Sequence, residues 1–543
     1  MFIKSVVLNF GSILFQVIRQ LRRIYLNSPI YNKKISKIDD KVIIYKPSQS
    51  ILGSLIKFHK KKYNIEDFSL NSVWKNSADL NSKNFKKLHS FFWLFTLDLK
   101  SSPKITQNII YNWIEENDKY KQNIWEMDIL SKRIISWISN SKLTYENAGK
   151  DYKMHFNSLI KKQTNHLINE ISRSEKLDDK IIGSTAIILV GLAYGDSYYL
   201  KFGINILKKI LIFSLDKSNF PKSRNLRQLV FYLKYLIIIR ELLKESQTTI
   251  PDFLDEIIYY LGKSYNLLCS NKKNGVLFNG NFNDTNKEFD EYLNFYKYKF
   301  KEDINEVGGY ISLKNKKSSL IIDIGRAPEK KFSKDYQAGL FAFEFEYMGE
   351  KVITNSGYFQ DYKHQLNIIS KSSATHSTLV LNNTSTVSYE RDKYGHMVVS
   401  KNFKILKKEI KIEKNHWFIK ASHDSYNKLN GVVHERQLKY FDKENKLEGC
   451  DKLIKTKNFK PTNFEIRFHL LPEVNLTKLL NNESILIENK NAGWKFTCKN
   501  NKIDIEKGLY FGNKNKYLEN KNILITGLTI PDEQNIIWEI SKI

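Results

Sequence analysis

The chain has 543 residues, a mass of 63.9 kDa and a formal net charge of +29. This length exceeds what one hydrophobic core usually organises, so we expect more than one domain, and an aromatic content of 13% excludes a largely disordered chain. The positive charge is spread along the chain and has no nucleic-acid motif behind it, so no nucleic-acid partner is expected. Two explanations stay open: an anionic partner, or the Lys, Asn and Ile bias of an A/T-rich genome.

Residues 1–49 predict an amphipathic N-terminal helix and a lead-in segment. Apolar residues recur at helical spacing, and arginines cluster near the end of the run, at Arg19, Arg22 and Arg23. The segment is too polar for a clean transmembrane span, and no small-residue cleavage site follows it. Such a helix either docks on its own domain or makes a peripheral contact with a membrane surface.

Residues 50–300 predict a helical domain of antiparallel helix pairs, either an open solenoid or a closed α/α toroid. Apolar residues recur at three- and four-residue spacing, and the connections are short and polar. The expected helices lie at 82–100, 105–117, 125–140, 154–172, 180–195, 199–215 and 226–244.

Residues 301–543 predict an antiparallel β-sandwich, because the apolar period changes to two near residue 300. Short alternating segments, separated by turns rich in Gly, Asn, Asp and Lys, include YISLKN, FAFEFEYMG, VVHERQLKYF and FEIRFHLL. Helices followed by strands make this an α+β multidomain chain. A ligand cleft is expected where the two domains meet.

An ordered set of motifs covers nearly the whole chain and resembles the heparinase II/III-like proteins. The motifs are RIISWI, SRNLRQLVFYL, AGLFAFEF, VITNSG, ATHSTLVL, HDSYN with VVHERQL, LEGCDKL, FEIRFHLLP, GWKF and LYFG. The resemblance implies an N-terminal α/α toroid, a C-terminal antiparallel β-sandwich and a polysaccharide lyase that cleaves an acidic, uronate-containing polysaccharide by β-elimination. That reaction needs a group that neutralises the uronate carboxylate, a base for the C5 proton and an acid for the leaving oxygen.

Three catalytic candidates follow from the resemblance. Asn225, at an expected helix start, matches the neutraliser, and its alternative role is a helix N-cap. His376 matches the histidine of the family's AHST motif, and its alternative is a buried histidine bonded to a neighbouring strand. Tyr336 is the candidate base or acid, and its alternative is a strand-edge aromatic.

The predicted substrate-binding residues are Arg224, Gln337, Asn355 and His434. Arg224 has a surface charge as its alternative, and His434 a structural role on a strand. The family usually carries histidines where this chain has Asp335 and Gln337, and an aspartate where it has Asn355. No metal site and no cofactor are expected: these residues do not make a zinc-ligand set, and Cys269, Cys450 and Cys498 are too far apart.

Two functions of different class therefore remain. The first is a lyase whose partner is an acidic polysaccharide, and the second is a catalytically inactive relative that binds an anionic glycan during envelope polysaccharide assembly. The resemblance places the protein in the cell envelope or periplasm. The cytoplasm is the alternative, because no clear signal peptide is present.

Overall fold

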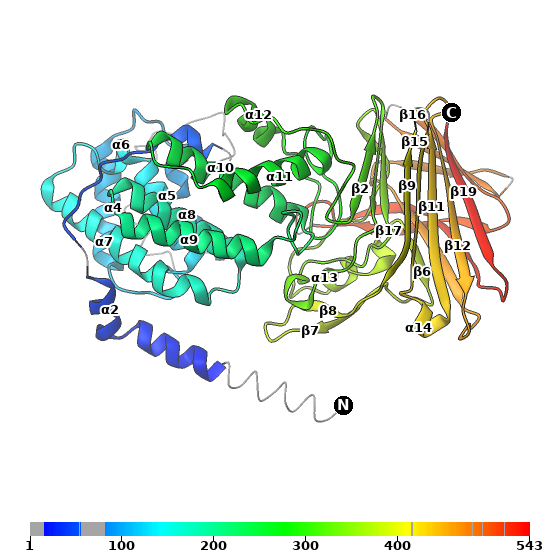
Figure 1. Ribbon diagram of the computed structural model, residues 1–543, viewed down its shortest axis with the longest axis horizontal. Coiled ribbons are helices and arrows are strands. Elements are labelled where there is room, and N and C mark those ends of the chain that lie inside the picture. Colours follow the sequence, from blue (N-terminus) through cyan, green and yellow to red (C-terminus); the bar gives the residue numbers. More distant parts are fainter. Residues whose placement is uncertain are drawn as a thin grey trace. The chain divides into compact units, whose positions relative to one another are not determined.

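A computed structural model describes residues 16–37, 39–53, 55, 82–413, 416–480, 482–490, 492–514 and 516–543 (Figure 1). The chain divides into two compact units. The helical unit comprises Met1–Ser214 and Phe231–Tyr259, and the sandwich unit comprises Leu215–Val230 and Tyr260–Ile543. The predicted boundary near residue 300 marks the position where the apolar period of the sequence changes. The compact units instead assign residues 215–230 and 260–300 to the sandwich unit.

The helical part of the chain contains successive helices, as predicted. In chain order they are α2 (Pro29–Ile35), α3 (Ser82–His89), α4 (Pro103–Asn117), α5 (Met127–Ser139), α6 (Ser141–Thr144), α7 (Lys150–Glu170), α8 (Leu177–Ala193), α9 (Ser197–Ser214), α10 (Leu226–Glu245), α11 (Asp252–Leu268) and α12 (Lys287–Phe295). The last three belong wholly or partly to the sandwich unit.

Helix α8 forms the centre of the helical unit. Its residues from Ile181 to Ala193 are all buried, which is the pattern of a helix covered on every side. Two glycines allow α9 to approach it closely. A Cβ on Gly191 would lie 2.5 Å from the backbone nitrogen of Leu200, and a Cβ on Gly203 would lie 2.6 Å from Cγ1 of Ile188.

The predicted helix at 82–100 is interrupted. Helix α3 ends at His89, and Phe91 takes a left-handed backbone conformation with φ of 56° before a 3₁₀ turn at Phe92–Thr96. The ring of Phe91 is fully buried and packs edge-on against Trp113 and Trp137, with centroids 5.6 Å and 5.1 Å away. Burial of this ring accounts for a break that helical periodicity did not predict.

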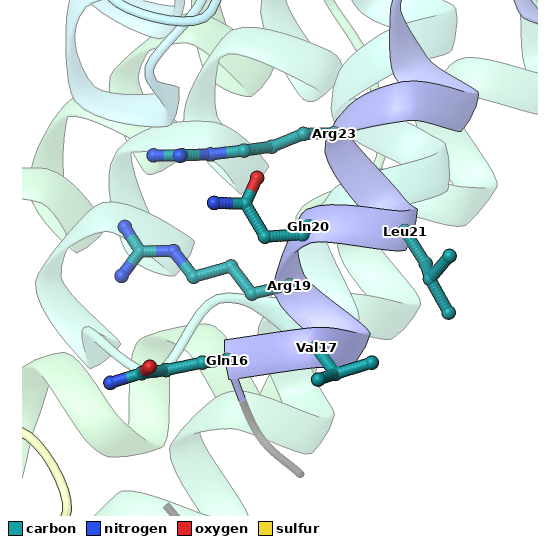
Figure 2. A pocket seen from close by; sticks show the side chains of 6 residues that line it. All are labelled: Gln16, Val17, Arg19, Gln20, Leu21 and Arg23. Atoms are coloured by element: carbon teal, nitrogen blue, oxygen red, sulfur yellow. The ribbon is translucent and has the colours of Figure 1, made fainter. Parts of the chain in front are cut away.

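Residues 16–26 form the described part of the N-terminal helix, and its two faces differ as predicted. The polar side chains of Gln16, Arg19, Gln20 and Arg23 extend from one side, and those of Val17 and Leu21 extend from the other (Figure 2). The predicted apolar positions Val6, Val7, Ile13 and Leu14 lie outside the described residues. Across the described ranges, no helix combines the length and apolar character needed to cross a bilayer.

The described residues of the sandwich unit form three larger antiparallel sheets and one separate two-stranded sheet. The five-stranded sheet has the order β1-β2-β3-β4-β5, the eight-stranded sheet β14-β15-β16-β19-β12-β11-β10-β9, and the four-stranded sheet β17-β18-β13-β6, while β7 and β8 pair alone. The strands are β1 (Glu306–Val307), β2 (Tyr310–Lys314), β3 (Ser318–Asp323), β4 (Phe343–Tyr347), β5 (Glu350–Ile353), β6 (Leu379–Leu381), β7 (Ser388–Arg391), β8 (Met397–Lys401), β9 (Ile405–Ile412), β10 (His416–His423), β11 (Val432–Phe441), β12 (Lys446–Lys455), β13 (Asn463–His469), β14 (Asn475–Lys478), β15 (Ser484–Asn489), β16 (Ala492–Cys498), β17 (Lys502–Tyr510), β18 (Leu518–Leu528) and β19 (Gln534–Lys542).

The three larger sheets share one hydrophobic core. Phe343 of β4 stacks on Trp538 of β19 at 5.6 Å, and Phe468 of β13 meets the same tryptophan edge-on at 4.7 Å. Each sheet thus contributes inward-facing aromatic residues, as strand alternation requires. The predicted order of helices followed by antiparallel sheets is confirmed.

Candidate functional site

Asn225 immediately precedes α10 and caps it. Its side-chain Oδ1 accepts hydrogen bonds from the backbone N–H groups of Arg227, at 2.9 Å, and Gln228, at 3.4 Å. These groups belong to the first turn and have no partner within the helix, so the N-cap alternative is present. Capping uses only the oxygen of the amide. The nitrogen Nδ2 donates instead to Oδ2 of Asp335 at 3.3 Å.

Asp335 links Asn225 to Tyr358, whose hydroxyl donates to Oδ1 of Asp335 at 3.1 Å. Burial raises the pKa of Asp335, but nearby positive charges outweigh burial, so this pKa lies below its ordinary value; the cations are Lys334, Arg227 and Lys371. Burial, followed by the charge of Asp335, raises the pKa of Tyr358 well above its ordinary value. At neutral pH an ionised carboxylate, a protonated hydroxyl and an amide therefore adjoin; we call them the Asn225–Asp335–Tyr358 centre.

The loop 272–283 packs against this centre through Gly280. Gly280 has φ of +82°, and a Cβ there would lie 2.6 Å from Nδ2 of Asn225 and 3.0 Å from Cβ of Asp335. A side chain at this position is excluded by both the backbone conformation and the space. The N–H of Gly280 donates to Oε1 of Gln337 at 3.1 Å, which holds the loop in place.

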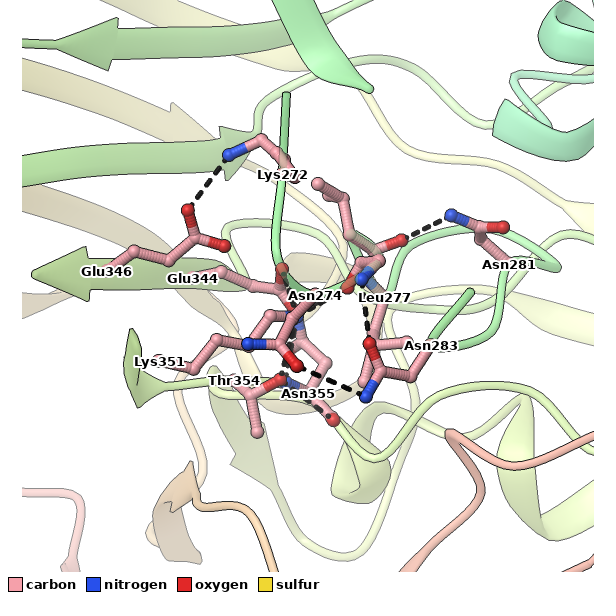
Figure 3. A network of polar contacts seen from close by, with 12 residues as sticks. Lys272, Asn274, Leu277, Asn281, Asn283, Glu344, Glu346, Lys351, Thr354 and Asn355 are labelled. Carbon is pink, nitrogen blue, oxygen red and sulfur yellow. Dashed lines mark hydrogen bonds and ion pairs between the residues drawn. The ribbon is translucent and has the colours of Figure 1, made fainter. Parts of the chain in front are cut away.

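A buried ion pair anchors the same loop to strands β4 and β5 (Figure 3). Nζ of Lys351 donates to Oε2 of Glu344 at 2.8 Å and to the carbonyl of Gly275 at 2.6 Å. Oε1 of Glu344 in turn accepts from the N–H of Leu277 at 3.2 Å. Both charged side chains are 1% exposed, so their pairing and these peptide hydrogen bonds must offset a large desolvation cost.

Gln337, predicted to bind substrate, is fully buried and its amide is occupied. Besides accepting from Gly280, it donates through Nε2 to the carbonyls of Gly357 at 2.9 Å and Ser370 at 2.6 Å. Both N–H donors of the amide are therefore used within the protein. The structure places Gln337 where it joins three chain segments, and its role in substrate binding stays a prediction.

Arg224 is also buried, with 6% of its surface exposed, which rules out its alternative as a surface charge. Its guanidinium donates to Oδ1 of Asp323 and to the carbonyl of Gly308, both at 2.6 Å, and lies over the ring of Tyr310. Burial lowers the pKa of Arg224, but the negative charge of Asp323 more than compensates. Arg224 therefore ties the segment before α10 to β2 and β3, next to Asn225.

Tyr336 and His376, the predicted proton-transfer residues, are 0% and 1% exposed. Among the described residues neither Oη of Tyr336 nor Nε2 of His376 has a hydrogen-bond partner, so the two are not bonded to each other. Nδ1 of His376 lies 2.9 Å from the carbonyl of Ser372. Burial raises the pKa of Tyr336 and lowers the pKa of His376 to about 4. Both side chains are uncharged at neutral pH, and their catalytic roles stay predictions.

His434 and Asn355 lie within the sandwich. His434 is fully buried, with Nε2 2.7 Å from Oδ1 of Asp451 and Nδ1 3.1 Å from Nε2 of His423. Asn355 accepts from the N–H of Ser377 at 2.9 Å. The burial of His434 matches its structural alternative, and the role of Asn355 in substrate binding stays a prediction. In the ranges that the structure describes, no three His, Cys, Asp or Glu side chains gather as a metal site would require.

Sequence reasoning missed two members of this region, Tyr358 and Arg227. The guanidinium of Arg227 lies over the ring of Phe282, 5.6 Å from its centroid, and its Nε finds no hydrogen-bond partner among the described residues. Signals for both were present, because Arg227 follows Asn225 within SRNLRQLVFYL and Tyr358 follows Gly357 at the end of VITNSG. Only the fold shows that these two motifs meet at Asp335.

Comparisons with known proteins agree with this architecture. Residues 305–539 match the family model described as Heparinase II/III-like, C-terminal. The structure is similar to heparan sulfate lyase HepC from Pedobacter heparinus, with 13% identity, a TM-score of 0.62, and coverage of 85% of this chain and 77% of that chain. It is also similar to a heparinase III crystal structure, with 14% identity, a TM-score of 0.66, and coverage of 94% and 88%.

At these identities the similarity establishes the fold, including the predicted combination of a helical toroid with a β-sandwich. No curated protein sequence matches the chain.

Proposed function

Because residues 305–539 match the Heparinase II/III-like, C-terminal family model, we propose that the chain is a polysaccharide lyase that cleaves an acidic, uronate-containing polysaccharide by β-elimination. The heparan sulfate lyase named above shares its fold, which supports a glycan as partner. The observation that carries the proposal is the Asn225–Asp335–Tyr358 centre. It joins an amide, an ionised carboxylate and a protonated hydroxyl through two hydrogen bonds.

The centre supplies the three groups that β-elimination needs. The Asn225 amide, with the Arg227 guanidinium two residues later, neutralises the uronate carboxylate. Asp335, ionised because its pKa is lowered, takes the C5 proton. The C4–O bond breaks as the C4=C5 double bond forms, and Tyr358, protonated because its pKa is raised, gives its proton to the leaving oxygen.

A second candidate is a catalytically inactive relative that binds an anionic glycan, and one observation favours it. The amide of Asn225 already donates to Asp335, so a fixed negative charge lies where an approaching uronate carboxylate would be neutralised. Repulsion between the two carboxylates opposes productive binding. Burial points the same way, because the proposed acid Tyr358 is 2% exposed and is nearly as enclosed as Tyr336 and His376.

The decisive experiment incubates the purified protein with hyaluronan, heparan sulfate, alginate and polygalacturonate and follows absorbance near 230 to 235 nm, roughly the range of a conjugated uronate. A rise in absorbance on at least one substrate is expected. Binding to a glycan without any rise in absorbance would refute the lyase proposal and support the inactive glycan-binding protein.

Variants of the centre separate catalysis from folding. Asn225→Ser retains an N-cap oxygen but removes the amide, whereas Asn225→Ala removes both and costs about 1 kcal/mol of stability. If the amide neutralises substrate, both variants lose activity while only Asn225→Ala loses stability. If Asn225→Ser were as active as the wild type, the role of Asn225 would be limited to capping α10.

Asp335→Asn distinguishes the two functions directly. It removes the proposed base, so the lyase should lose about a hundredfold or more in rate. In an inactive binding protein the same change removes a repulsive charge, and affinity for an acidic glycan should rise. Tyr358→Phe serves as the companion variant, because it removes the proposed acid without changing charge.

We further propose an envelope location. The exposed apolar side chains of the N-terminal helix support a peripheral membrane contact: Leu21 is 61% and Ile24 is 68% exposed. Arginines on the same helix suit an anionic lipid surface.

A further inference from the structure

A depression of about 530 Å³ lies on the sandwich unit, outside the Asn225–Asp335–Tyr358 centre. It is lined by Phe359, Asp361, His364, Leu366, Lys516 and Tyr517. The first four come from one segment of the chain and the last two from the segment before β18. Its walls combine aromatic rings with a cation, a carboxylate and an imidazole, which suits a ligand with both apolar and polar groups.

Two aromatic rings give the depression an apolar surface, and they differ in how exposed they are. Tyr517 is 54% exposed, although its ring is large and mostly apolar. Phe359 is 6% exposed and is fixed from behind, with Phe511 edge-on at 6.1 Å and His364 at 5.0 Å between centroids. One wall of the depression is therefore rigid, and the other offers a free ring face.

The polar groups are oriented for hydroxyl and anion contacts. Nδ1 of His364 accepts the N–H of Leu366 at 3.1 Å, so the neutral ring carries its proton on Nε2, where it is a donor. Oδ1 of Asp361 accepts the N–H of Lys363 at 3.0 Å, which fixes the carboxylate as an acceptor. Lys516 lines the depression and forms no ion pair with any residue that the structure describes, so its charge is available to a ligand.

The depression is connected to the centre through the backbone. Phe359 follows Tyr358, whose hydroxyl reaches Asp335. Gly357 pairs with Phe511 in a parallel bridge, and the N–H of Phe511 donates to the carbonyl of Ser356 at 2.5 Å. These contacts fix the segment that leads into Phe359 against Phe511, which directly follows β17.

We propose that this depression is a glycan subsite that binds one acidic pyranose unit next to the reacting bond. The apolar face of the sugar ring stacks on Tyr517, its hydroxyls contact Asp361 and His364, and Lys516 pairs with its carboxylate or sulfate. The inference rests on the proposed action on an acidic polysaccharide. It adds the place on the protein where the neighbouring sugar unit of that polysaccharide binds. Phe359 and Leu366 contribute apolar side chains to the lining.

The test is a titration of the full chain with three probes: hyaluronan oligosaccharides, which carry carboxylates only, dextran sulfate, which carries sulfates only, and neutral dextran. Tyr517→Ala should weaken binding of the preferred acidic probe about tenfold, because it removes the stacking surface. Lys516→Ala should weaken it several-fold and reduce its dependence on salt. Tyr198→Ala is the matched control, since Tyr198 is a 60% exposed tyrosine in the helical unit.

The outcomes separate the subsite from the proposed function. Tight binding that is unchanged in both Tyr517→Ala and Lys516→Ala overturns the subsite and leaves the lyase proposal intact. If binding depends on Tyr517 but absorbance near 230 to 235 nm, roughly the range of a conjugated uronate, does not rise, the subsite is supported and the lyase proposal is rejected. Equal binding of neutral dextran, or no binding of any probe by the wild-type protein, overturns the acidic subsite.

Discussion

Lys351→Met is the sharpest test of how the loop 272–283 is held against the Asn225–Asp335–Tyr358 centre. The substitution keeps the length of the side chain but removes the ammonium group, which donates to Glu344, Gly275 and Thr354 at 2.8, 2.6 and 3.3 Å. Glu344 is then left as an uncompensated charge with 1% exposure. Breaking a buried pair in this way costs about 3–5 kcal/mol.

The structure offers a matched control in the same loop. Lys273 pairs with Glu350 at 3.4 Å, but its side chain is 61% exposed, so Lys273→Met should cost less than about 1 kcal/mol. The double variant Lys351→Met/Glu344→Leu should recover part of the loss, because no buried charge remains. It should not reach wild-type stability, since the N–H of Leu277 and the carbonyl of Gly275 lose partners at about 1 kcal/mol or more each.

Guanidinium unfolding followed by hydrogen exchange measures these differences. Peptides of the sandwich unit should be read separately, because a chain with two compact units need not unfold in one step. Peptides covering residues 272–283 should exchange faster in Lys351→Met than in Lys273→Met. Equal stability of these two variants, or a double variant as unstable as Lys351→Met, would refute the ion pair as the anchor of the loop.

Three further predictions concern other parts of the molecule. Burial lowers the pKa of His376 to about 4, so the unfolded chain binds this proton at a higher pH than the folded chain does. The free energy of unfolding should therefore fall by about 3 kcal/mol from this residue as the pH drops from about 6.5 to 4. His376→Gln should flatten the measured pH dependence of stability, and an unchanged slope would contradict this. Gly280→Ala should destabilise the protein and reduce glycan turnover more than Gly395→Ala, since both glycines have positive φ but only Gly280 has close neighbours. Leu21→Asp should lower cosedimentation with anionic vesicles, and retention at wild-type levels would exclude membrane contact through the exposed helix face.

The order and type of most elements were predictable because they follow from local periodicity. Helices α4, α5 and α7 to α10 lie within or close to their predicted ranges. Strand β9 was not among the predicted strands, since half of the residues in its sequence ILKKEIKI are charged and its burial is slight. It is a strand because it pairs with β10 in register, for example Ile410 opposite Ile419. That contact is formed by the fold and has no local signal.

The candidate site divides in a similar way. The capping role of Asn225 could be anticipated, because an asparagine before an apolar helix is a local pattern. The occupied amide of Gln337 and the enclosure of Tyr336 could not, since burial depends on chain segments that are distant in sequence. The centre itself joins Asn225 to Asp335 across 110 positions.

The sequence by itself determined a helical region followed by antiparallel strands, and a family resemblance carried by ordered motifs. Periodicity and turn chemistry act over a few residues, so they can be recognised without the fold. The tertiary structure decided which polar side chains meet. It buried His376 and Tyr336, and it placed Tyr358 and Asn225 on the two oxygens of Asp335, where desolvation and nearby cations set their protonation.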